Sequence, residues 1–295
     1  MGIFANPLTD LLEYEDFSRD FLKGTDPVGM TGCIDSEKVH FMSTFLGEKK
    51  VQLVVTYNEQ RAREIEEDYK LFCSQVYVIP PRDLIFFSAD LQGNAIIAER
   101  MKAFAALYQN EAKVIITTID ALMSAAVPFE QLMSHVIKLK EGDELDLEKL
   151  KHDLTVMGYE RVGRVEEPGQ FTVHGGIADV YPLTMEVPVR IELWGDEIDT
   201  IRCFEPQSQR SMDQIESVSV FPAAEVIADD TARRRAVGMI QNELESQLAV
   251  FKKVKEPDKA KRLREETNRI LEALDEEVVL EAPDSYISYF YPRTV

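Results

Sequence analysis

The chain has 295 residues and a formal net charge of −20, with 53 acidic and 33 basic side chains. An acidic surface repels duplex phosphates unless charge is strongly segregated, so we expect weak or no DNA binding and contacts with other proteins instead. Three scattered cysteines and four scattered histidines, without C-x-x-C spacing, argue against a disulfide framework or a zinc site. No apolar run reaches the ~18 residues of a membrane span and the N-terminus lacks a secretory signal, which predicts a cytoplasmic chain without a membrane partner.

Helix and strand patterns alternate in the first part of the chain. Helical spacing is present at residues 8–12 and 17–22 and over the longer segments 58–72 and 95–108. Short β-branched runs predict buried strands at 50–56, 76–79 and 114–118. This β-α-β-α-β order predicts a parallel sheet with right-handed crossovers.

The pattern changes near Pro128, where period-two alternation begins. Alternation means that one face of each strand is buried and the other is wet. A short helix over 147–157 ends at Gly158, a residue type favoured at that position. These signals predict a small antiparallel sheet with one helix, as a second domain at 128–208. The predicted strands are 136–140, 170–174, 177–181, 189–194 and 198–204.

The last part of the chain begins with one more strand, at 216–222. We expect it to rejoin the first sheet, so that residues 1–127 plus 209–222 form one domain and 128–208 is inserted into it. Residues 223–295 read as a mostly helical and truncated segment, with charged helices at 231–255 and 257–277. The basic run 233–235 could bind phosphate, but its acidic neighbours favour a solvated helix face.

A parallel α/β sheet raises the question of nucleotide binding, and residues 29–36 are the candidate loop. A phosphate-binding loop follows the pattern G-x-x-x-x-G-K-[ST], in which glycines allow close backbone approach and the lysine meets the phosphates. Gly29, Gly32 and Ser36 suit this pattern, but Ile34 replaces the second glycine and Asp35 replaces the lysine. We therefore predict no ATP binding and no cofactor.

Two other patterns resemble ion-binding sites but have simpler structural interpretations. The run 193–197 imitates a strand followed by Mg²⁺-binding acids, and the pair Gly175 and Gly176 could form an anion-binding nest. Both stretches separate alternating strands, which favours hairpin turns. No Ser-His-Asp order with local support and no G-x-S-x-G motif is present, so we predict no catalytic residues.

Several segments carry a family resemblance. Residues 169–182, 188–202 and 208–211 resemble the nucleotide excision repair protein UvrB and, more closely, the transcription-repair coupling factors (Mfd), and so do 158–161 and 286–291. The likeness covers nearly the whole chain. It implies a degenerate helicase-like, P-loop-type parallel sheet with an inserted small α+β antiparallel domain, as in UvrB.

The departures from UvrB favour the coupling factors. UvrB has an intact phosphate-binding loop, and it inserts a DNA-gripping β-hairpin for which the short span from residue 80 to the helix at 95 leaves no room. The coupling factors continue into an RNA-polymerase-binding domain and a translocase motor. The resemblance therefore implies that this chain is a fragment, which meets RNA polymerase and DNA only through parts of the whole protein that it lacks.

The resemblance also implies a docking site for UvrA on the inserted domain. Arg161 matches one of the family's docking arginines, whereas Thr172 and His174 stand where UvrB has two others. Phe171 either adds a contact or belongs to the core. The expected function is to recruit UvrA to stalled RNA polymerase in transcription-coupled nucleotide excision repair, without catalysis. The alternative is a UvrB-like, ATP-dependent subunit that binds damaged DNA.

Overall fold

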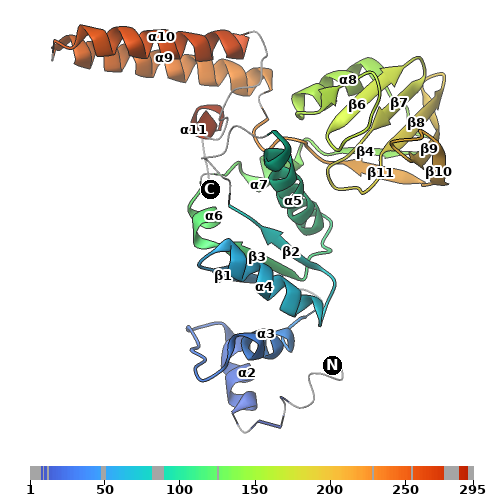
Figure 1. Ribbon diagram of the computed structural model, residues 1–295, viewed down its shortest axis with the longest axis vertical. Helices are drawn as coiled ribbons and strands as arrows, with labels where there is room; N and C mark the ends of the chain where they lie inside the picture. Colours follow the sequence, from blue (N-terminus) through green and yellow to red (C-terminus); the bar gives the residue numbers. More distant parts are fainter. Residues whose placement is uncertain are drawn as a thin grey trace. The chain divides into compact units, whose positions relative to one another are not determined.

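A computed structural model describes the chain, and its described residues form two compact units. The first unit combines residues 1–82 with 106–123, and the second combines residues 83–105 with 124–295. The boundary at residue 105 falls within helix α5 (Asp90–Tyr108). Each unit is treated separately below (Figure 1). The described residues are 8, 10–11, 13–47, 51–81, 90–124, 126–227, 229–253, 255–275 and 286–291.

The first unit contains a parallel sheet of three strands in the order β1-β3-β2. Every residue of β3 is buried, as expected for the central strand of such a sheet. The strands are β1 (Gln52–Thr56), β2 (Val76–Ile79) and β3 (Val114–Thr118). The parallel sheet predicted from the alternating pattern is therefore confirmed.

Helices of the first unit pack on this sheet and on one another. The Asn58 side chain accepts a hydrogen bond from the Arg61 N–H and caps the start of α4, as its position predicted. Ile65 and Tyr69 of α4 are buried against Val114 and Ile116 of β3. The predicted helix at 17–22 lies within α2, while residues 9 and 12 of the one predicted at 8–12 lie outside the described residues. The helices are α2 (Tyr14–Lys23), α3 (Asp35–Ser43), α4 (Glu59–Lys70) and α6 (Ile119–Met123).

The second unit contains a six-stranded sheet in the order β10-β9-β8-β7-β6-β5 and a separate pair of strands, β11 and β4. All neighbours are antiparallel except β5 and β6. The predicted small antiparallel sheet is confirmed, with one short parallel edge. The strands are β4 (Ile137–Lys140), β5 (Glu160–Arg161), β6 (Gln170–His174), β7 (Ile177–Val180), β8 (Val189–Trp194), β9 (Glu197–Phe204), β10 (Ser211–Gln214) and β11 (Ser217–Val220).

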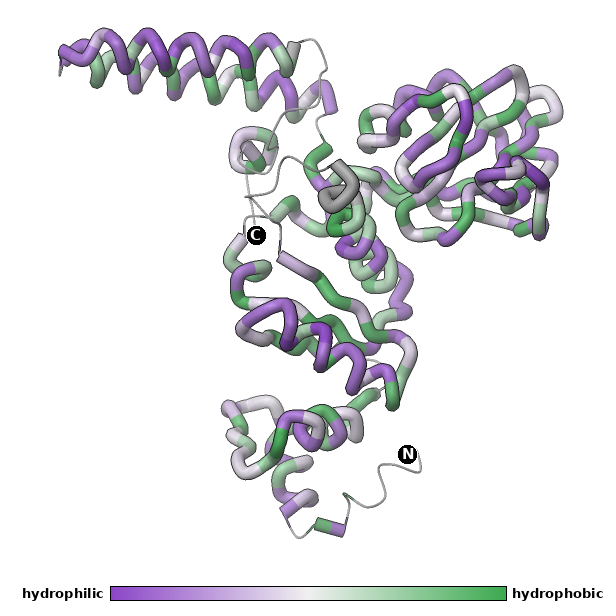
Figure 2. The backbone as a smooth tube through the Cα atoms, in the orientation of Figure 1, coloured by the Kyte–Doolittle hydropathy of each residue, from purple (hydrophilic) through white to green (hydrophobic). Residues whose placement is uncertain are grey.

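The core of this unit lies between the six-stranded sheet, the β4–β11 pair and helix α8 (Leu147–Val156). The apolar face of each strand turns inward, which appears in Figure 2 as green segments alternating with purple ones. Gly158, just beyond α8, has a φ of +88° and lets the chain reverse toward β5. The Tyr159 hydroxyl then donates a 2.7 Å hydrogen bond to the Phe221 carbonyl.

One topological prediction is wrong. The strand predicted at 216–222 does not rejoin the parallel sheet, because β11 pairs with β4, where Val218 lies opposite Leu139. Val218 and Val220 are buried in the core of the second unit. Strand β10 likewise pairs with β9, so residues 209–222 pair within the second unit. The other domain boundaries stay a prediction.

The second unit also includes a helical hairpin and shorter helices. In Figure 1, α9 and α10 run side by side. The Asp229 carboxylate accepts a hydrogen bond from the Ala232 N–H at the start of α9. No helix among the described residues is long and apolar enough to cross a membrane. The helices are α7 (Phe129–Met133), α9 (Asp230–Lys253), α10 (Pro257–Asp275) and α11 (Ile287–Phe290).

The basic run at 233–235 contributes to folding rather than standing free. The Arg235 guanidinium donates a 3.0 Å hydrogen bond to the Phe290 carbonyl, and Arg233 pairs with Asp230 at 3.8 Å. Arg234 is exposed and lies 4.0 Å from the same carboxylate. These contacts support the interpretation of a helix face over that of a phosphate grip.

Candidate protein-interaction surface

The six-stranded sheet has two different faces. One face packs against α8 through Phe171, Val173 and their neighbours, and we call the opposite one the outer face. Residues of β6 alternate between them, so Thr172 and His174 belong to the outer face. On the neighbouring strands Asp179 pairs with Thr172, and Ile177 pairs with His174.

A half-buried ion pair lies on the outer face. Arg190 of β8 donates two hydrogen bonds to Asp179 of β7, at 2.8 and 2.7 Å, in the bidentate geometry of strong pairs. This hydrogen bond raises the pKa of Arg190 above its usual value. The Arg190 guanidinium also lies 4.8 Å above the centre of the Phe204 ring. Phe204 forms a second small core with Val165 and Tyr181, so this part of the outer face is closed to partners.

The residues predicted to dock differ in exposure. Arg161 and His174 are exposed, whereas Thr172 is 5% exposed and Phe171 is fully buried. Thr172 Oγ1 lies 2.8 Å from His174 Nε2, so Thr172 orients the imidazole instead of offering its own surface. Phe171 belongs to the core, the second of its two predicted roles.

The structure does not gather the four residues on one face. Arg161 lies directly opposite Phe171 in the β5–β6 pairing, and paired residues point to the same side of a sheet. His174 is three residues farther along β6 and belongs to the outer face. The two-residue period of β6 therefore places Arg161 and His174 on opposite faces of the sheet.

Arg161 nevertheless has the character of a docking residue. It lies on β5, the edge strand of the sheet, and no hydrogen bond or ion pair of its side chain occurs within the described part of the chain. An arginine free of internal partners keeps five donors for a carboxylate or carbonyl on another protein. Edge strands also present unpaired backbone groups to a partner.

Two apolar side chains on the outer face were not singled out as contacts from the sequence. Trp194, at the end of β8, is 83% exposed, and Ile177 is 40% exposed. Exposed tryptophan is unusual on a free surface and is enriched at binding hot spots. The only sequence signal was a tryptophan placed directly before a Gly-Asp turn.

The degenerate phosphate-binding loop lies in the first unit, between two helices. Helix α2 ends at Lys23 and α3 begins at Asp35, and no strand occurs between them. Gly32 has a φ of +84°, whereas Ile34 has an ordinary φ of −71°. No strand of the parallel sheet therefore leads into this loop, which a nucleotide-binding loop requires. Of the other two residues that suited the pattern, Gly29 lies in the loop between α2 and α3, and Ser36 lies within α3.

Asp35 occupies the position of the missing lysine and is held by cations. Its carboxylate lies 3.1 Å from Lys38 and 3.5 Å from Arg61. The hydrogen bond from Lys38, together with the charges of Arg61 and Lys38, lowers the pKa of Asp35 below its usual range. A carboxylate that already pairs with the local cations therefore occupies the start of α3, where a bound phosphate would need a lysine.

Both simpler interpretations of the glycine-containing stretches are confirmed. Trp194 pairs with Glu197 and leaves a two-residue hairpin turn in which Gly195 has a φ of +67°. His174 pairs with Ile177 around an equivalent turn, with Gly175 at +59°. Among the residues that the structure describes, no group of three or more His, Cys, Asp or Glu side chains could hold a metal ion.

Comparison with known proteins defines the class of the sheet region of the second unit. The family model described as UvrB interaction domain matches residues 137–225, which run from β4 to just beyond β11. The part of the second unit that carries Arg161 and His174, residues 137–225, is thus a UvrB interaction domain.

Full-length relatives define the family. A transcription-repair-coupling factor of Bacillus subtilis (strain 168) is 30% identical over 294 residues, which is 98% of this chain and 25% of that protein. The one from Staphylococcus haemolyticus (strain JCSC1435) is 33% identical over 231 residues, 77% of this chain and 19% of that protein. This chain belongs to the transcription-repair-coupling factor family and is homologous to its N-terminal region. It spans between about a fifth and a quarter of these relatives' length.

Proposed function

We propose that this chain is a non-catalytic protein-interaction module that recruits UvrA to stalled RNA polymerase in transcription-coupled nucleotide excision repair. The observation that carries the proposal is the match of the UvrB interaction domain to the sheet unit, whose edge strand exposes Arg161. The relatives are named for coupling transcription to repair, which agrees with this role. RNA polymerase and DNA are contacted by other parts of the whole protein, in the cytoplasm.

The first unit supports this role as a scaffold. We propose that its parallel sheet is a degenerate form of a helicase-like, P-loop-type fold, into which the UvrB interaction domain is inserted as in UvrB. The acidic loop start at Asp35 and the absence of a strand between α2 and α3 support a fold without nucleotide binding. In this proposal the chain acts in repair as a scaffold that positions the interaction domain, and it catalyses no reaction.

Docking is proposed at the β5 edge, with Arg161 as the central contact. The net charge of −20 makes a free arginine at a sheet edge a distinctive feature for a partner to recognise. Because His174 points to the outer face, a partner contacts both residues only if it wraps around the edge strand. Substituting each residue separately therefore locates the partner on the sheet.

The test is calorimetric titration of the whole chain with purified UvrA. Arg161→Glu is expected to cost ~2 kcal/mol or more, a loss of at least about 30-fold in affinity, if Arg161 is a hot spot. Arg234→Glu makes the same charge change at an exposed position on α9 and should leave the affinity within about twofold. Equal affinities of the wild-type chain and Arg161→Glu for UvrA would contradict the proposed site. Failure of the wild-type chain to bind UvrA would contradict the proposed function.

A further inference from the structure

The turn between α9 and α10 concentrates positive charge on a strongly acidic chain. Residues 251–264 contain seven basic and two acidic side chains, in a chain whose net charge is −20. This segregation is local, since the rest of the chain is correspondingly more negative. A basic segment of this kind attracts an anionic partner. The acidic surfaces of the rest of the chain repel that partner, which directs it to the basic segment. The basic residues are Lys252, Lys253, Lys255, Lys259, Lys261, Arg262 and Arg264.

Four of the seven cations lack a partner of their own. No ion pair or side-chain hydrogen bond of Lys252, Lys253, Lys255 or Arg264 occurs within the described residues. Lys259 and Arg262, in contrast, pair with Glu256 at 2.8 Å and Glu266 at 3.1 Å. The unpaired cations are therefore the ones available to a ligand.

The backbone of Lys255, in the turn between α9 and α10, has an unusual conformation. Its φ of +59° lies in the left-handed region, which glycine adopts without strain and which lysine adopts at a cost. Cations in the last turn of a helix, such as Lys252, are explained by the helix dipole alone. Lys255 caps the C-terminal end of α9, where the Glu256 N–H donates a 3.0 Å hydrogen bond to the Phe251 carbonyl. Arg264 lies within α10, away from that end, so the dipole of α9 does not explain it.

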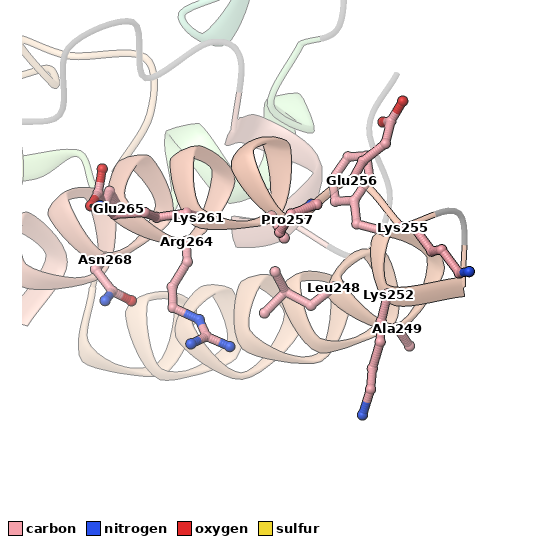
Figure 3. Close-up of a pocket in the computed structure, with 12 residues that line it drawn as sticks. Leu248, Ala249, Lys252, Lys255, Glu256, Pro257, Lys261, Arg264, Glu265 and Asn268 are labelled. Carbon is pink, nitrogen blue, oxygen red and sulfur yellow. Dashed lines mark ion pairs between the residues drawn. The ribbon is translucent and has the colours of Figure 1, made fainter.

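Three of the unpaired cations, Lys252, Lys255 and Arg264, border a groove between the two helices. The groove has a volume of about 820 Å³, and Figure 3 shows Leu248 between the helices with Arg264 reaching from α10 toward α9. Lys252 and Lys255 stand at the end of the groove nearest the turn (Figure 3). The apolar lining comes from both helices, namely Leu248, Ala249 and Phe251 of α9 and Pro257 and Ala260 of α10.

The hairpin leaves this apolar seam only partly covered. No described residue between 241 and 266 is buried, whereas Ile240 and Thr267, just outside this stretch, are. Two helices alone cannot enclose their facing apolar side chains, and a third helix in the groove would bury them. These partly covered apolar side chains are therefore better suited to contact with an additional helix than to contact with water.

We infer that the α9–α10 groove binds an acidic amphipathic α-helix of a protein partner. The apolar side of that helix would lie on Leu248, Phe251 and Ala260, and its carboxylates would meet Lys252, Lys255 and Arg264. Duplex DNA fits less well, because a phosphate backbone uses the cations and leaves the apolar floor unsatisfied. This site is separate from the UvrB interaction domain at 137–225.

A designed peptide tests the inference directly. The probe is a fluorescein-labelled 18-residue helix with leucines at i, i+3, i+4 and i+7 and glutamates on the other positions, measured by anisotropy against the whole chain. A peptide of the same composition in scrambled order and a labelled duplex DNA serve as comparison ligands. We expect the amphipathic peptide to bind at least about tenfold more tightly than either comparison ligand.

Matched charge reversals locate the binding. Lys255→Glu with Arg264→Glu is expected to weaken peptide binding at least about tenfold. Lys259→Glu with Arg262→Glu makes an equal charge change on residues that do not line the groove, and should change affinity less than about threefold. Circular dichroism checks that both variants keep the wild-type helix content.

Apolar substitutions complete the test. Leu248→Ser should weaken binding, whereas Val250→Ser, at a 49% exposed position outside the groove, should not. No peptide binding by the wild-type chain overturns the inference. So does equal weakening by the two charge-reversed pairs, a preference for the scrambled peptide, or tighter binding of duplex DNA.

Discussion

Asp179 and Arg190 face each other on strands β7 and β8, and their side chains are joined by two hydrogen bonds of 2.8 and 2.7 Å. The Asp179 side chain is 9% exposed and that of Arg190 is 21% exposed. Arg190 stacks on Phe204, which is itself fully buried. The pair therefore stabilises the part of the outer face that is covered by Phe204. The part of that face near His174 and Trp194 stays exposed for contacts with other molecules.

Replacing Asp179 with asparagine should destabilise the second unit by about 2 kcal/mol. The substitution keeps the shape but leaves the Arg190 charge with a neutral partner in a poorly solvated place. Urea unfolding followed by circular dichroism measures the loss. Asp199→Asn, at an exposed position on β9, is the matched control and should change stability by less than about 0.5 kcal/mol. Equal stability of the wild-type chain and Asp179→Asn would show that the pair contributes little.

Gly158→Ala should destabilise the second unit by at least about 2 kcal/mol. Its φ of +88° disfavours any side chain, and an added Cβ would lie 2.6 Å from the Cβ of Ala224. Gly163→Ala is the control, because nothing lies within 4 Å of its added Cβ and its φ is not in the left-handed region. Thermal unfolding of both variants compares them, and a similar midpoint for the two would contradict this account of Gly158.

The sequence predicted the buried strands of both sheets, because such strands carry local patterns of apolar residues. It did not predict the edge strands β5 and β10, whose residues are exposed. It failed for β11, whose alternating Val218 and Val220 show that one side is buried but not which sheet covers it. Pairing with Leu139 of β4 is a contact between distant parts of the chain, and no local pattern records it. The structure was therefore needed to show which strands lie at the edge of a sheet and which strand pairs with β11.

The candidate site was predictable in its residue types but not in its geometry. Arg161 and His174 are exposed as expected, but the two-residue period of β6 and the β5 pairing place them on opposite faces. Burial of Thr172 and Asp179 was also missed, because alternation predicted that the second face of the sheet is wet. A small core of Val165, Tyr181 and Phe204 covers part of that face instead.

The loop before α3 should not bind ATP even when its lysine is restored. We expect no binding of a fluorescent ATP analogue at micromolar concentrations by the wild-type chain or by the double variant Ile34→Gly with Asp35→Lys. The reason is that the loop follows α2 rather than a strand, so its backbone N–H groups have no sheet to position them. Mg²⁺-dependent binding by the wild-type chain would favour the UvrB-like ATP-dependent alternative. Binding by the double variant alone would show that the replaced glycine and lysine, and not the missing strand, prevent ATP binding.

Stability of the second unit should fall at alkaline pH through Tyr159. Burial raises the pKa of this tyrosine above its usual value of 10.0, and its hydroxyl donates to the Phe221 carbonyl. Since the folded-state pKa is the higher one, the stabilisation is complete below pH 10 and is lost as the pH rises above it. Urea unfolding at pH 8 and pH 11 should show this loss in the wild-type chain and a smaller one in Tyr159→Phe. Tyr57→Phe, at a 73% exposed position, should keep the wild-type pH dependence, and identical profiles for all three chains would exclude Tyr159 as the cause.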